Sequence, residues 1–181
     1  MLPRALRLLL PSLLLPFFLF SFLPASPALA SERTFTEFAL DLPEGWDGSD
    51  RAGFISKDRN EYMLVVGKKD EANEQYLAHI SLFLLPNKPG KNAHDSAQVL
   101  AEQQADASEL RERGLFWTFT GNPRDNVLKG MATTYVAASP ETLCIIIVKD
   151  PSQINAVDIL ESLRPVSDRA KALFGDKTFQ K

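Results

Sequence analysis

The sequence is short of the residues that build most catalytic and metal centres: its 181 residues include one cysteine and two histidines. With Cys144 alone, no disulfide can form within the chain. His79 and His94 are not an i, i+4 pair, and no cysteine stands at a metal-ligand spacing from them. No Walker loop, dinucleotide-binding glycine pattern or Gly-x-Ser-x-Gly elbow occurs. We therefore expect no catalytic residues, no metal site and no cofactor.

The chain also lacks an excess of charge of one sign. Twenty basic and 23 acidic residues give a formal net charge of −3 at pH 7, and the two signs are interspersed. A nucleic-acid-binding surface needs a basic face, and an anionic membrane surface attracts clusters of Lys and Arg. We therefore expect neither a nucleic-acid partner nor electrostatic attachment to lipid.

The one long apolar run lies at the beginning of the chain. Arg4 and Arg7 precede a stretch of Leu and Phe, and the small residues Ala28 and Ala30 stand before Ser31. This is the order of a cleavable secretory signal. The run is broken by prolines and is shorter than the roughly 20 apolar residues of a spanning helix. We predict that residues 1–30 are a signal peptide cleaved between Ala30 and Ser31, and that the protein is periplasmic or secreted with no membrane span afterwards.

The rest of the chain alternates between strand-like and helix-like patterns. Phe38, Leu40 and Leu42 alternate with polar or small residues, which predicts a strand over residues 34–42 that ends at Pro43 and Gly45. Similar patterns predict strands at 51–57, 62–67, 79–85, 115–120, 127–138 and 143–148. The 62–67 segment lacks alternation, which indicates a strand covered on both faces.

Two helices are expected between and after these strands. Residues 92–110 are rich in helix-forming residues, with Ala97 and Ala101 on the face that would approach the sheet. Asn92 or Asp95 would cap its beginning. Residues 151–163 repeat apolar residues every three positions, and Pro165 ends this second helix.

The order of these elements indicates the fold class. Adjacent strands joined by short turns favour a mostly antiparallel sheet with helices packed on its faces, which is an α+β fold. We expect a single domain over residues 31–165 and a polar C-terminal tail over residues 166–181.

The first of these strands carries a family resemblance. The pattern Phe38-x-Leu40-x-Leu42-Pro43-x-Gly45-Trp46 resembles the opening of the PsbP-like group and of the related bacterial DcrB-like periplasmic proteins. The predicted order of elements follows that group over residues 35–165. The resemblance implies an α/β/α sandwich around a twisted antiparallel sheet. It implies an accessory role rather than a shared catalytic site, and it supplies no residues to equate with a partner-binding surface.

The segment after this motif contains the best candidate for a binding site. We hypothesise that a loop over residues 43–51 binds a partner, with Trp46 as an aromatic anchor and Asp47, Asp50 and Arg51 as a polar rim. Two alternatives stay open. Trp46 would cover the core instead, and the Asp47–Asp50 segment would be a solvated turn or would hold a cation.

These observations leave three functional hypotheses. The first is an exported, non-enzymatic accessory or binding protein of the cell envelope that contacts another envelope protein. The alternative is a periplasmic protein that binds a small molecule or metal ion. A hydrolase with an unrecognised site is the third and has the least support. Cys144, inside an aliphatic run, is expected to be a buried and unreactive thiol.

The signal assignment gives the first prediction. Because Ala28 and Ala30 meet the small-residue requirement of the signal peptidase, the exported protein should begin at Ser31. Intact-mass analysis of the exported protein measures this directly. A mass that retains residues 1–30 would contradict it.

Overall fold

The computed structural model describes residues 30–55, 60–70, 72, 75–88, 90–123, 130–175 and 179. The predicted signal peptide lies outside the described residues except for Ala30, so its cleavage stays a prediction. Among the described residues, no helix has the length and apolar character needed to cross a membrane.

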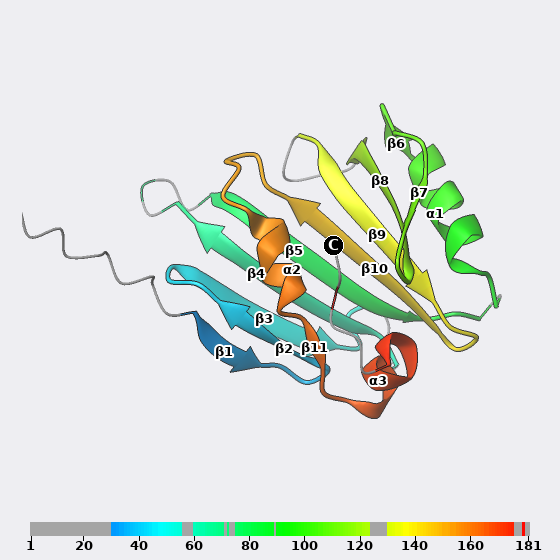
Figure 1. Ribbon diagram of the computed structural model, residues 1–181, viewed down its shortest axis with the longest axis horizontal. Coiled ribbons are helices and arrows are strands. Elements are labelled where there is room, and N and C mark those ends of the chain that lie inside the picture. The colour runs from blue at the N-terminus through cyan, green and yellow to red at the C-terminus, as the bar shows by residue number, and fades with distance from the viewer. Residues whose placement is uncertain are drawn as a thin grey trace, which may run out of the picture.

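An eight-stranded sheet forms the centre of the molecule (Figure 1). Its strand order is β3-β4-β5-β10-β9-β8-β6, with β7 also paired to β8, and every pair is antiparallel. The strands are β3 (Trp46–Ala52), β4 (Tyr62–Lys69), β5 (Tyr76–Pro86), β6 (Gln104–Ala105), β7 (Arg111–Arg113), β8 (Phe116–Pro123), β9 (Ala132–Ala138) and β10 (Thr142–Lys149). The predicted α+β class with an antiparallel sheet is confirmed.

A second, smaller sheet and three helices complete the fold. The small sheet consists of β1 (Ser31–Thr34), β2 (Phe38–Leu42) and β11 (Arg164–Pro165). The helices are α1 (Ala93–Glu102), α2 (Ala156–Glu161) and α3 (Asp168–Phe174). In Figure 1 the small sheet, α2 and α3 lie in front of the large sheet, and α1 lies at the opposite end beside β8 and β9.

Alternation along the strands separates two cores on the two faces of the large sheet. On β9, Tyr135 and Ala137 belong to the main core, which also contains β2, α2 and α3. Val136, between them, belongs to a second core with Phe119, Ala97 and Ala101 of α1. Helices therefore cover both faces, as the predicted sandwich requires. The small-residue face of α1 packs as predicted, with Ala97 fully buried.

Several predicted boundaries are wrong, each for a local reason. The 34–42 strand is interrupted, because the amide of Phe35 donates to the carbonyl of Phe38 and turns the chain between β1 and β2. The strand expected at 51–57 begins earlier, at Trp46, and residues 56–59 lie outside the described part. The helix expected over 92–110 does begin after an Asn92 cap, but it ends at Glu102, and Asp106 follows with a positive φ of 54°.

The last third of the chain also differs from the prediction. The helix expected over 151–163 is shortened to Ala156–Glu161, because the Asp150 carboxylate accepts from the amides of Ile154 and Ala156 and holds a turn before it. The strand expected over 127–138 begins at Ala132 where it is described. The expected polar tail instead contains α3, and Phe174 and Phe179 are buried in the main core.

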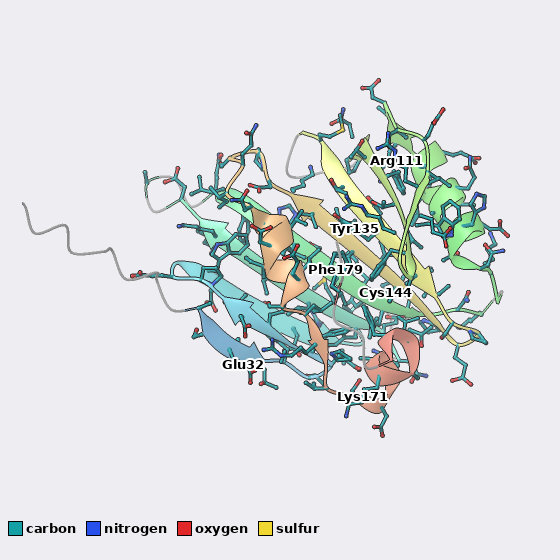
Figure 2. The ribbon with its side chains drawn as sticks, viewed as in Figure 1. Glu32, Arg111, Tyr135, Cys144, Lys171 and Phe179 are labelled. Carbon is teal, nitrogen blue, oxygen red and sulfur yellow. The ribbon has the colours of Figure 1, made fainter. Side chains whose placement is uncertain are left out.

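Cys144 lies at the centre of the large sheet (Figure 2). Its side chain is 0% exposed, and burial raises the pKa of the thiol. The predicted burial is confirmed. A thiol that stays protonated is a poor nucleophile, so its low reactivity follows from its position.

The packing of α1 gives the second prediction. Ala101→Phe should overfill the contact between α1 and the β8–β9 surface and lower the free energy of unfolding by about 1–3 kcal/mol. Val99→Phe is the matched control, because Val99 lies on the same helix and is 40% exposed. Chemical denaturation measures both. Equal stability of the two variants would show that Ala101 does not approach the sheet.

Candidate functional site

The residues predicted to form a binding loop lie on β3, an edge strand of the large sheet. Trp46 pairs with Lys68 and Arg51 pairs with Met63 of β4, so the expected loop over 43–51 is a loop only up to Gly45. Alternation places Trp46 and Asp50 on the face that carries the main core, and Asp47 and Arg51 on the opposite face. The structure therefore does not bring the four residues together as one anchor with one polar rim.

Trp46 itself lies at the mouth of a groove. Gly45 turns the chain with a φ of +80°, and the Trp46 amide donates to the carbonyl of Pro43 at 3.1 Å. The indole is half-buried and packs against the main core. The groove has a volume of about 290 Å³ and is lined by Asp41, Pro43, Trp46, Ile154, Asn155, Asp158, Ile159 and Ser162, and by Ala30, which the predicted cleavage before Ser31 would remove. We call this the Trp46 groove. Trp46 packs against the main core and is also partly exposed, and its role as a partner anchor stays a prediction.

Arg164 holds Asp41, one of the residues that line the Trp46 groove, in place. Its guanidinium donates to both carboxylate oxygens of Asp41, at 2.7 and 3.2 Å, and to Glu32 at 2.7 Å. These bonds join the three strands of the small sheet. Hydrogen bonding by Arg164 holds the pKa of Asp41 below its usual value, so the pair stabilises the fold above that value and the contribution is lost as the pH falls. Because Asp41 is 41% exposed, the pair contributes no more than about 1 kcal/mol.

Asp47 and Asp50 both accept hydrogen bonds at the edge of β3. Just after β3, the backbone amide of Gly53 donates to the carbonyl of Glu61. The backbone groups of odd-numbered β3 residues therefore hydrogen-bond to β4, and those of even-numbered residues face the free edge of the sheet. Asp47 accepts from the edge-facing amide of Gly48 at 2.7 Å and is held by Arg33 at 2.8 Å. Asp47 therefore covers an unpaired donor of the edge strand.

The Asp50 side chain lies at the same free edge of β3 but on the opposite face of the sheet from Asp47. It accepts from the Thr36 amide at 2.7 Å. Burial raises the pKa of Asp50, but the hydrogen bonds from Thr36 outweigh that effect and leave the pKa below its ordinary value. Asp47 and Asp50 thus point to opposite faces, which is unsuited to one cation site. Among the described residues, no group of three His, Cys, Asp or Glu side chains is placed to hold a metal.

Neither histidine lines the Trp46 groove. His94 packs edge-on against Trp117 at 4.6 Å between ring centroids and lies 3.3 Å from Asp95. His79 pairs across strands with Lys149, and burial together with the charge of Lys149 lowers its pKa. Within the described part of the chain, neither ring hydrogen-bonds to a serine, threonine or cysteine.

Part of the large sheet is not covered by any helix of the described residues. On the face that carries α1, that helix contacts β8 and β9, and the neighbouring strands β10, β5 and β4 continue the face beyond it. Half-buried apolar side chains from these three strands belong to neither core: Met63, Val65, Phe83, Ile145 and Ile147. The pairings place Met63, Phe83 and Ile145 in one row across the strands. We call these five residues the open face.

A buried cation lies at one end of the open face. Lys149 follows Ile145 and Ile147 on the same side of β10 and is 2% exposed. Its ammonium has no hydrogen-bond partner among the described residues, and burial lowers its pKa. The sequence prediction missed this surface, because the apolar run of β4 indicated a strand covered on both faces.

The described residues form an α+β domain in which the Trp46 groove lies beside the small sheet and the open face lies on the other side of the large sheet. No protein-family model and no curated protein matches the chain. Among solved structures it is similar to cyanobacterial PsbP (CyanoP) from Synechocystis sp. PCC 6803, with a TM-score of 0.42 and 13% sequence identity over 79% of this chain and 96% of that chain. This likeness concerns the fold alone, and the DcrB-like part of the resemblance stays a prediction.

The edge of β3 gives the third prediction. Asp47→Ala should leave the amide of Gly48 unpaired on the free edge and increase self-association, because uncovered edge strands pair with other chains. Sedimentation velocity measures the dimer fraction. Glu44→Ala removes an exposed acid from the preceding turn and serves as the control. A monomer fraction equal in both variants would show that Asp47 does not protect the edge.

Proposed function

We propose that this protein is an exported, non-enzymatic accessory protein of the cell envelope that binds another protein through the Trp46 groove. The observation that carries the proposal is the half-buried indole at the mouth of a groove between two separate parts of the chain. Trp is the residue type most often found among the positions that dominate binding energy at protein interfaces.

The size and chemistry of the groove favour a protein partner. Its volume of about 290 Å³ is at the lower limit of pockets for small molecules, which run from about 300 to 1,000 Å³. It has room for one or two side chains of a partner. Pro43, Ile154 and Ile159 supply apolar walls, and Asp41 and Asp158 add acidic groups at the rim. The partner segment that fits is an apolar side chain next to a basic residue.

The groove is also suited to binding because it is held in place before a partner arrives. The amide of Asp41 donates to the Ser162 hydroxyl at 2.9 Å, and that hydroxyl donates to the carbonyl of Ile159 at 2.7 Å. These bonds connect β2 to the end of α2. A preformed groove loses less conformational entropy on binding than a mobile loop.

The fourth prediction tests this function. Trp46→Ala should weaken capture of the partner from the native envelope by about 30-fold, which corresponds to about 2 kcal/mol at an interface hot spot. Crosslinking of tagged protein in intact cells followed by mass spectrometry measures capture. Trp117→Ala is the matched control, because Trp117 is also half-buried but lies on the opposite face against the second core.

Thermal stability distinguishes a binding role of Trp46 from a packing role. Thermal unfolding of both variants shows how much of any lost capture comes from lost packing. Loss of capture for Trp46→Ala alone, at similar thermal midpoints, supports the proposal. Equal capture by the two variants, or losses that follow the midpoints, rejects it.

A further inference from the structure

The open face ends at a charge that the described part of the protein does not neutralise. Lys149 is 2% exposed, and its ammonium has no hydrogen-bond partner there. A buried cation without a partner costs free energy, because it loses its water and gains no acceptor. Such a group is retained in a fold more readily when it has an anion to bind.

The acidic residues nearest to Lys149 in the sequence and in its row of the sheet accept hydrogen bonds from other groups. Asp150 follows Lys149, but its two oxygens accept from the amides of Ile154 and Ala156 at 2.9 Å each. Asp47 on β3 lies in the same cross-strand row as His79 on β5 and Lys149 on β10. Its carboxylate, however, accepts hydrogen bonds from Arg33 and from the amide of Gly48. The row therefore presents Lys149 beside His79 with no acid directed to them among the described residues.

The apolar residues run from this cation along the strands. On β10, Ile145 and Ile147 precede Lys149 on one side of the strand, and the four-residue distance from Ile145 to Lys149 corresponds to about 13 Å. Val65 on β4 and Phe83 on β5 widen the strip, and the Phe83 ring packs against Phe54 at 5.7 Å between ring centroids. A hollow of about 310 Å³ lies over Val65 and Gly67 at the edge of this strip, and Asp47, Lys69 and Tyr76 also line it. The surface is thus an apolar strip with a basic end.

We propose that the open face binds a long-chain carboxylate of the fatty-acid type, with its alkyl chain along the apolar strip and its carboxylate at Lys149 and His79. The strip supplies apolar area that no helix covers. The two bases, directly opposite each other on neighbouring strands, approach one anion from two sides. The carboxylate supplies the acceptor that the Lys149 ammonium lacks. This site is on the other face from the Trp46 groove and does not depend on it.

The test uses the purified protein and dodecanoate below its micelle concentration, measured by isothermal titration calorimetry. Dodecanoate should bind saturably and raise the thermal midpoint, because a ligand bound to the folded state stabilises it. Dodecyltrimethylammonium has the same chain with the opposite charge and should bind at least tenfold more weakly. Acetate, which has no alkyl chain, should not bind.

Two variants separately remove the basic end and the apolar strip of the proposed site. Lys149→Met should weaken dodecanoate binding at least tenfold while the protein still unfolds cooperatively, because it replaces an unpartnered buried charge with an apolar side chain of similar length. Ile147→Asn should weaken binding through the strip and gives an independent result if Lys149→Met does not fold. Val99→Asn, at an exposed apolar position on α1, should bind as the unchanged protein does.

Three results would overturn the proposal. These are the absence of saturable dodecanoate binding, equal binding of the cationic analogue, and full dodecanoate affinity in the folded Lys149→Met protein. Saturable binding of the cationic analogue alone would identify the strip as a general apolar surface, such as a contact for another protein, and would reject the carboxylate. Partner capture through Trp46 is measured independently of all these titrations.

Discussion

The burial of one face of the large sheet is the constraint on which the rest of the fold depends. Leu40, Leu64 and Ile146 are at most 2% exposed, and they lie on three different strands of the two sheets. Each large apolar side chain buried in this way contributes about 1.5–3 kcal/mol. The small sheet, α2 and α3 all lie over this face, and Phe179 reaches the same core beside Tyr135 (Figure 2). Within the described residues this face is closed over most of its area, so the Trp46 groove lies at its margin and the open face lies on the opposite side of the large sheet.

The fold was predictable from sequence where a strand shows one buried face. The alternation of Phe38, Leu40 and Leu42 predicts β2, and the small residues of α1 predict its packing. Boundaries were less predictable, since they depend on distant partners. Asp150 delays the beginning of α2 by bonding two amides, and Phe174 makes a helix of a segment with polar composition.

The candidate sites were predictable in residue type but not in placement. Trp46 is identified as a possible anchor by its size alone, and the structure confirms that it is partly exposed. The separation of Trp46 from Asp47 onto opposite faces depends on β3 being a strand rather than a loop. The open face has no sequence signal, because an apolar run on β10 looks the same whether one or two faces are covered. Only the position of α1 over β8 and β9 decides it.

The small sheet also determines when the protein can finish folding. Its strands come from both ends of the domain: the Arg164 side chain on β11 bonds to Glu32 on β1, 132 residues away. Contacts with such large sequence separation form late, because a long loop must close before they stabilise anything. A chain that emerges from a membrane channel starting at its N-terminus therefore cannot complete this sheet until β11 has emerged. Until then β1 and β2 lack their C-terminal partner.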